Sequence, residues 1–65
     1  MNTNTDSLPT LLIQRLQDND AVVRRLAVRE LGDSIEDDAV NWLLRALQDS
    51  DSQVRQEAAS LLGRI

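Results

Sequence analysis

The sequence predicts an all-α fold in which two antiparallel helical hairpins stack side by side, as in a short piece of an α-solenoid. Three observations predict this architecture. The 65-residue chain contains an internal repeat, both copies carry apolar residues at helical spacing, and short polar breaks separate the apolar segments. Each expected element follows from one of these observations.

The repeat appears when the sequence is shifted by 31 residues, which places residues 11–34 over residues 42–65. Ten of these 24 pairs are identical, and a period of this length is typical of stacked helical repeats. The identical pairs are Leu12/Leu43, Leu16/Leu47, Gln17/Gln48, Asp18/Asp49, Asp20/Asp51, Val23/Val54, Arg24/Arg55, Ala27/Ala58, Leu31/Leu62 and Gly32/Gly63.

Each copy has two segments in which apolar residues recur at intervals of three and four, as on one face of a helix. We therefore expect helices over residues 9–17, 21–31, 37–48 and 52–64. The stripes expected to face the core are, in chain order, Leu8, Leu12 and Leu16; Val23, Leu26, Ala27 and Leu31; Val40, Leu43, Leu44 and Leu47; and Val54, Ala58, Leu61, Leu62 and Ile65.

Clusters of Asp, Asn and Ser at residues 18–20 and 49–52 separate the two helices of each copy. Such residues favour turns and helix N-caps, and connections this short require the two helices to lie antiparallel. Paired carboxylates are also compatible with acid–base chemistry or a hard cation. Their place at the start of a helix favours capping, and no calcium-binding loop follows them.

The polar segment between the copies spans residues 33–38 and contains four acids, which we expect to cap the third helix and complement its dipole. Ser34 or Asp37 is expected near the N-cap, and a binding role for the acids is the alternative. Gly32 comes directly after the last apolar residue of the second helix, where a left-handed C-terminal cap favours glycine.

The composition excludes several classes of function. The net charge is −4, with 11 acids against seven bases that are all arginine, so nothing favours binding to nucleic acid or to an anionic membrane. No histidine, cysteine, lysine or tyrosine is present, which removes most nucleophiles, general bases and transition-metal ligands. We therefore expect neither an enzyme nor a bound cofactor or metal.

The expected organisation is a flexible leader over residues 1–7 and a single domain over residues 8–65, with repeats at 8–33 and 34–65. The leader is polar and lacks the apolar segment of a signal peptide, and no apolar run approaches the length of a membrane span. The expected location of the protein is the cytoplasm.

The repeated pattern resembles the short HEAT-like repeat, in which Leu is followed by Asp-x-Asp, Val-Arg, Ala and Leu-Gly. The second copy carries it at residues 47–65 and the first at residues 16–32. The resemblance implies a non-catalytic scaffold for protein interactions. Some members of this family belong to the lyases that attach bilins to phycobiliproteins, or take part in the turnover of those antennae. An accessory role in such a system is the alternative function.

Arg24 and Arg55 recur four residues after Asp20 and Asp51. This spacing allows pairing within one helix as well as contact with the neighbouring repeat. The resemblance implies that such Asp and Arg residues link adjacent units, and we expect this structural role rather than ligand binding.

The residues expected to bind a partner lie on the second and fourth helices. Opposite the stripe that contains Val23 and Leu31, the second helix carries arginine and valine, a mixture that suits an acidic or amphipathic partner; a merely solvated face is the alternative. The residues expected on this surface are Arg25, Val28, Arg29, Gln56, Ala59 and Ser60.

Trp42 is the only aromatic residue and lies at the edge of the third helix's apolar stripe. It either packs on the flank of the core or, if partly exposed, is the strongest single binding residue in the chain. We include it among the candidate partner-binding residues.

The expected partner is another protein. Because two repeats leave two end faces without a neighbour, we also expect a homodimer, with the C-terminal repeats of two copies joined symmetrically.

Overall fold

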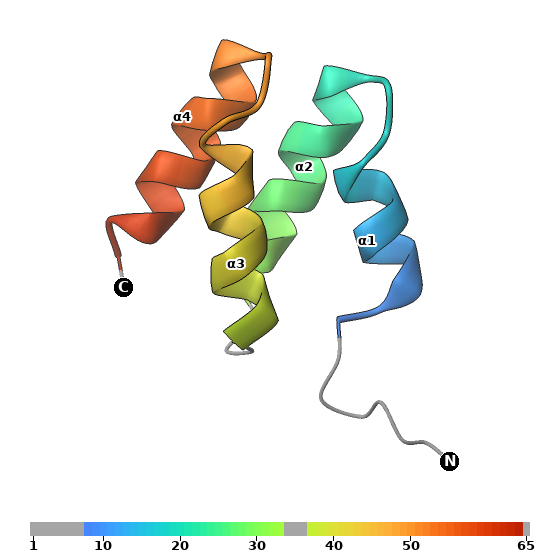
Figure 1. Cartoon of the computed structure of the whole chain (residues 1–65), viewed down its shortest axis with the longest axis horizontal. Helices are drawn as coiled ribbons and strands as arrows, with labels where there is room; N and C mark the ends of the chain where they lie inside the picture. The colour runs from blue at the N-terminus through green and yellow to red at the C-terminus, as the bar shows by residue number, and fades with distance from the viewer. Residues whose placement is uncertain (1–7, 34–36, 65) are drawn as a thin grey trace.

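The computed structural model describes residues 8–33 and 37–64 and contains four helices in this part of the chain (Figure 1). The all-α prediction is confirmed, and each helix lies within its expected range. The helices α1, α3 and α4 end one or two residues before the positions expected for them. The four helices are α1 (Thr10–Leu16), α2 (Ala21–Leu31), α3 (Asp37–Ala46) and α4 (Ser52–Leu62).

Aspartate side chains begin the second helix of each unit, as predicted. Asp20 accepts a hydrogen bond from the backbone N–H of Val22, and Asp51 accepts from the N–H groups of Gln53 and Val54. These bonds satisfy amides that have no partner within the helix. The helix α1 has no such side-chain cap.

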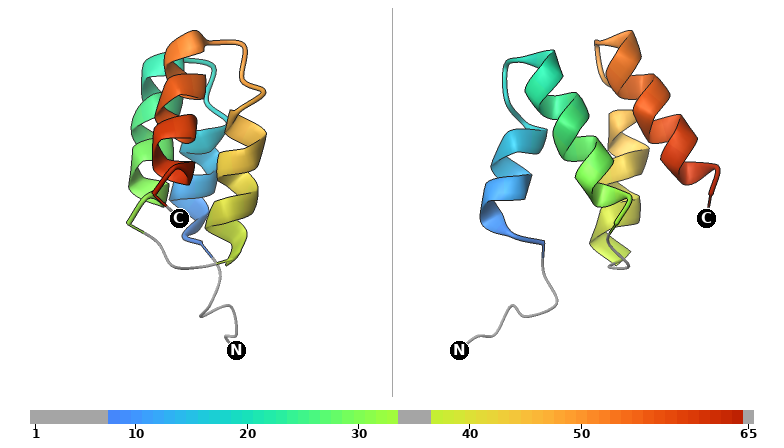
Figure 2. Two further views of the ribbon diagram at one scale, coloured as in Figure 1. Left: turned by 90° about the vertical axis from the view of Figure 1, so that its left-hand side faces the viewer. Right: turned by 180° about the vertical axis from the view of Figure 1, so that it is seen from behind.

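The helices form two layers, with α1 and α3 in one and α2 and α4 in the other (Figure 2). Each hairpin is antiparallel. The two helices of the second layer lie against each other, and α2 also packs against α1 and α3. The helix α2 is therefore the central element of the stack, because it contacts α1 of its own unit and both helices of the second unit.

Aliphatic residues from all four helices make up the core. Val28 is 2% exposed and packs in this core, so its expected place on the outer face of α2 is wrong. Leu26 and Leu44, expected in the core, are 46% and 50% exposed. The buried residues are Leu8, Leu12, Ala27, Val28, Leu31, Ala39, Leu43, Ala46, Val54, Ala58 and Leu61.

Gly32 ends α2 in a right-handed conformation, with φ −65° and ψ −19°, so the expected left-handed cap is wrong. The reason for a glycine here is space. A Cβ atom at this position would lie 2.6 Å from the Cδ2 atom of Leu61. The close approach of α4 to the end of α2 therefore explains the missing side chain.

In the segment between the units, Asp37 and Asp38 lie in the first turn of α3, where their charge suits the helix dipole. Asp37 is the first residue of α3. Ser34, the other residue expected near the N-cap, lies outside the described residues, as do the leader at residues 1–7 and Ile65.

Candidate protein-binding surface

A polar hollow of about 430 Å³ lies between α2 and α4 on the second layer. On α2 the lining residues are four positions apart, and on α4 they recur at intervals of three and four, so each helix presents them on one side. We call this surface the α2–α4 face. Its residues are Arg25, Arg29, Gln53, Gln56, Glu57, Ser60 and Arg64.

The charge of the α2–α4 face is opposite to that of the whole chain. Three of its residues are arginines and one is a glutamate, whereas the chain carries −4. Arg29 Nε lies 3.7 Å from Glu57 Oε2, and the Arg29 side chain is 67% exposed. This long contact leaves most of the Arg29 guanidinium open to a ligand.

Arg25 has an unsatisfied donor on the same face. Its Nε atom is shielded from solvent and has no hydrogen-bond partner among the described residues. A shielded N–H group without an acceptor costs free energy. The rest of the Arg25 side chain lines the hollow beside Arg29 and Arg64, and arginines bind carboxylates with charge-assisted hydrogen bonds. The face is therefore suited to an anionic group.

The structure brings together four of the seven residues predicted for partner binding: Arg25, Arg29, Gln56 and Ser60 all line the hollow. Ala59 is exposed on α4 but does not line it. Val28 is buried, so it offers no surface to a partner.

Three lining residues were not among those predicted for partner binding: Gln53, Glu57 and Arg64. Gln53 lies three residues before Gln56, and Glu57 lies three residues before Ser60, so helical spacing alone would have placed each beside a residue that was predicted. Arg64 follows the end of α4, where no periodic signal exists.

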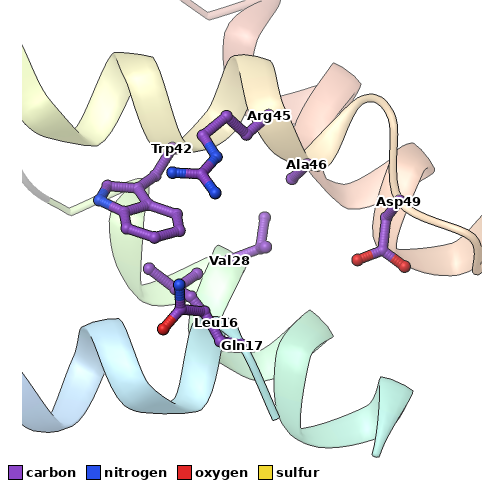
Figure 3. Close-up of a pocket in the computed structure, with 7 residues that line it drawn as sticks. All are labelled: Leu16, Gln17, Val28, Trp42, Arg45, Ala46 and Asp49. Carbon is purple, nitrogen blue, oxygen red and sulfur yellow. The ribbon is translucent and has the colours of Figure 1, made fainter. Parts of the chain in front are cut away.

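Trp42 lies elsewhere, in the layer formed by α1 and α3. Figure 3 shows its ring at a smaller hollow of 150 Å³, facing Leu16 of α1, with Val28 nearby. The guanidinium carbon of Arg45 is 4.3 Å from the centre of the ring, a cation–π distance. Trp42 is half-buried and packs against the core, and it does not contribute to the α2–α4 face.

The two units are joined by Arg24 and Asp49. Arg24 donates from Nε to Asp49 Oδ2 and from Nη2 to Asp49 Oδ1, both at 3.0 Å. The hydrogen bond from Arg24 lowers the pKa of Asp49 below its usual value and, reciprocally, raises the pKa of Arg24. The expected contact of Arg24 with the neighbouring repeat is confirmed, but its partner is Asp49 and not Asp51.

A second ion pair lies at the outer side of the first unit. Arg15 of α1 donates to both carboxylate oxygens of Glu30 on α2. This hydrogen bond lowers the pKa of Glu30. Both side chains are more than two-fifths exposed, so water screens the pair.

Two equivalent helical hairpins, stacked with an ion pair between them, define a protein of the helical-repeat class. Within that class, the sequence model of the family described as HEAT repeats matches residues 9–65. The chain therefore belongs to the HEAT-repeat family. No curated protein and no solved structure gives a significant match. In the described part of the chain, no helix is both long and apolar enough to cross a bilayer.

Proposed function

We propose that this protein is a non-catalytic interaction module whose α2–α4 face binds an acidic segment of a partner protein. The observation that carries the proposal is the hollow lined by three arginines and one glutamate in a chain that is acidic as a whole. Membership of the HEAT-repeat family supports the general role, since stacked helical repeats present extended surfaces to other proteins.

The partner's chemistry follows from the lining residues. Arginine side chains favour carboxylates, which they bind with two parallel hydrogen bonds. The glutamines and Ser60 supply neutral donors and acceptors beside them. An exposed acidic helix or loop with several Asp or Glu residues fits this surface better than an apolar segment, because the hollow is lined mainly by polar groups.

A peptide selection tests the proposal. A library of random peptides selected on the intact chain should yield sequences enriched in Asp and Glu. A chosen acidic peptide should bind more weakly as salt is raised. The variant that combines Arg25→Gln with Arg29→Gln should lose binding, whereas Arg45→Gln, on the opposite layer, should retain it.

Neither arginine of the double variant belongs to the buried core, so the helicity of the variant should be unchanged. Circular dichroism checks this for each variant. Selected peptides without acidic residues, or equal binding by the double variant, would refute the assignment of the α2–α4 face.

The sequence resembles the short HEAT-like repeat, and some members of that family belong to bilin lyases. A narrower form of the proposal is therefore that the partner is a phycobiliprotein or a lyase subunit and that this chain is an accessory. Mixing the chain with a bilin-free phycobiliprotein subunit and following complex formation by native electrophoresis tests this form. A failure to form a complex would remove the phycobilisome role and leave acidic-peptide binding to be judged by the selection.

A further inference from the structure

The contact between the two units has a repeating geometry. Besides its ion pair with Asp49, Arg24 donates from Nη1 to the backbone oxygen of Asp18 at 2.7 Å. The carboxylate of Asp49 in turn accepts from the backbone N–H of Asp51 at 2.9 Å. The Arg24 and Asp49 side chains are thus each oriented by a hydrogen bond to the backbone of their own unit.

Each half of this contact occurs a second time, at the two ends of the stack. Arg55, the counterpart of Arg24, donates from Nη1 to the backbone oxygen of Asp49 at 2.7 Å. Asp18, the counterpart of Asp49, accepts from the N–H of Asp20 at 2.8 Å. Among the described residues, Arg55 forms no ion pair with a carboxylate, and the Asp18 carboxylate receives no arginine.

Apolar surface accompanies these two groups. In the first unit, Val28 and Leu31 are 2% and 1% exposed because the second unit covers them. Their counterparts on α4, Ala59 and Leu62, are exposed and half-buried. On the opposite end, Leu11 is 70% exposed, whereas its counterpart Trp42 is half-buried against the first unit.

We propose that the chain associates with itself head to tail, with Arg55 of one copy bound to Asp18 of the next copy. The contact repeats the one between Arg24 and Asp49, so the stack continues from one molecule into another. Charge complementarity favours this arrangement over a symmetric joining of two C-terminal ends. The symmetric form brings two Arg55 side chains into one interface and leaves the Asp18 carboxylate outside it.

A head-to-tail contact leaves an unpaired Asp18 at one end of every open assembly and an unpaired Arg55 at the other, so association continues beyond the dimer unless the stack closes into a ring. The new contact is weaker than the internal one. Arg15 and Glu30, which form an exposed ion pair, occupy the positions that correspond to Ala46 and Leu61 in the second unit. A polar pair at this surface replaces two apolar residues, so the association is reversible and depends on concentration.

Sedimentation equilibrium of the intact chain over roughly a hundredfold range of concentration tests the proposal. We expect a continuous rise in mass past the dimer. Asp18→Asn, which keeps the oxygen that accepts from Asp20, and Arg55→Gln should each weaken association by about tenfold or more. The control is Arg45→Gln, which removes the same positive charge as Arg55→Gln but at a position outside the proposed contact. It should leave association unchanged.

The variant Asp18→Asn separates the two geometries, because a symmetric contact between C-terminal ends does not include Asp18. A dimer that is insensitive to Asp18→Asn would overturn the head-to-tail assignment. A single species of 7.3 kDa at every concentration would overturn self-association altogether.

Discussion

Arg24 of the first unit and Asp49 of the second form a two-point ion pair in which each side chain is 15% exposed. The low exposure distinguishes this contact from the Arg15–Glu30 pair, whose side chains are 42% and 48% exposed. Charge-assisted hydrogen bonds that are shielded from water contribute more to stability than screened surface pairs. At the junction between the two units, Arg24 and Asp49 are therefore the ion pair expected to contribute most to stability, beside the buried aliphatic residues that the units share.

The first prediction concerns pH. The pKa of Asp49 is lower in the folded protein than its ordinary value of 3.8. Its ionised form therefore stabilises the fold above this ordinary value, and this stabilisation is lost as the pH falls through the lowered pKa. Asp49→Asn should lower the free energy of unfolding by about 1–3 kcal/mol near neutral pH, and by progressively less as the carboxyl is protonated.

Urea unfolding followed by circular dichroism, at neutral pH and in acid, measures this difference. Glu30→Gln is the control, since the exposed Arg15–Glu30 pair should show a smaller effect at every pH. A cost of Asp49→Asn that stays constant down to the most acidic condition would contradict the assignment.

The second prediction compares the two equivalent glycines. Both end their helices in a right-handed conformation that alanine adopts without strain. At Gly32 a Cβ atom would meet the buried Leu61 side chain at 2.6 Å, whereas at Gly63 the nearest atom is 3.4 Å away. Gly32→Ala should destabilise by about 1–3 kcal/mol through overpacking, and Gly63→Ala should be neutral or stabilising by a few tenths of a kcal/mol.

Thermal melts of both glycine variants at low protein concentration test this comparison. Equal melting temperatures would show that α4 does not approach the end of α2 as closely as described.

The third prediction compares two adjacent leucines on α3. Leu43 is 2% exposed and Leu44 is 50% exposed. Leu43→Ala should cost about 2–5 kcal/mol, because it removes buried methyl groups and leaves a cavity. Leu44→Ala should cost less than about 1 kcal/mol. Chemical unfolding of the two variants distinguishes them, and a larger loss for Leu44→Ala would mean that α3 presents its other side to the core.

The existence of the helices and their pairing were predictable, because the 31-residue period and the turn residues are local signals. Asp20 and Asp51 cap α2 and α4 at the positions expected from their type. The side of α2 that faces the core was less predictable. Leu26 is apolar but 46% exposed, and its counterpart in the repeat is Glu57, a residue that suits solvent. Comparison of these two counterparts would have corrected the stripe.

Val28 shows why hydrophobic spacing is insufficient for a central helix. The helix α2 contacts all three other helices, so it is buried on more than one side. A single stripe, defined by Val23 and Leu31, therefore describes only part of its covered surface.

For the candidate binding surface, Arg25 and Arg29 were predictable because they lie one helical turn apart. Arg64 was not, since its place depends on how α4 approaches α2.

The fourth prediction uses Trp42 as a reporter of the packing between α1 and α3. Leu16 lines the same hollow as the tryptophan ring, and Figure 3 shows the two side chains facing each other. Leu16→Ala removes apolar contacts from that hollow and admits water, so the fluorescence emission of the folded protein should shift to longer wavelength.

Leu47→Ala is the matched control, because Leu47 is the repeat counterpart of Leu16. Both are partly buried against the core, but Leu47 does not line the hollow. Each substitution should cost about 1–3 kcal/mol in stability, below the range for fully buried leucines. Only Leu16→Ala should change the tryptophan emission of the folded state. Equal emission from both variants would mean that α1 does not pack against Trp42, and that the ring is covered from within the second unit alone.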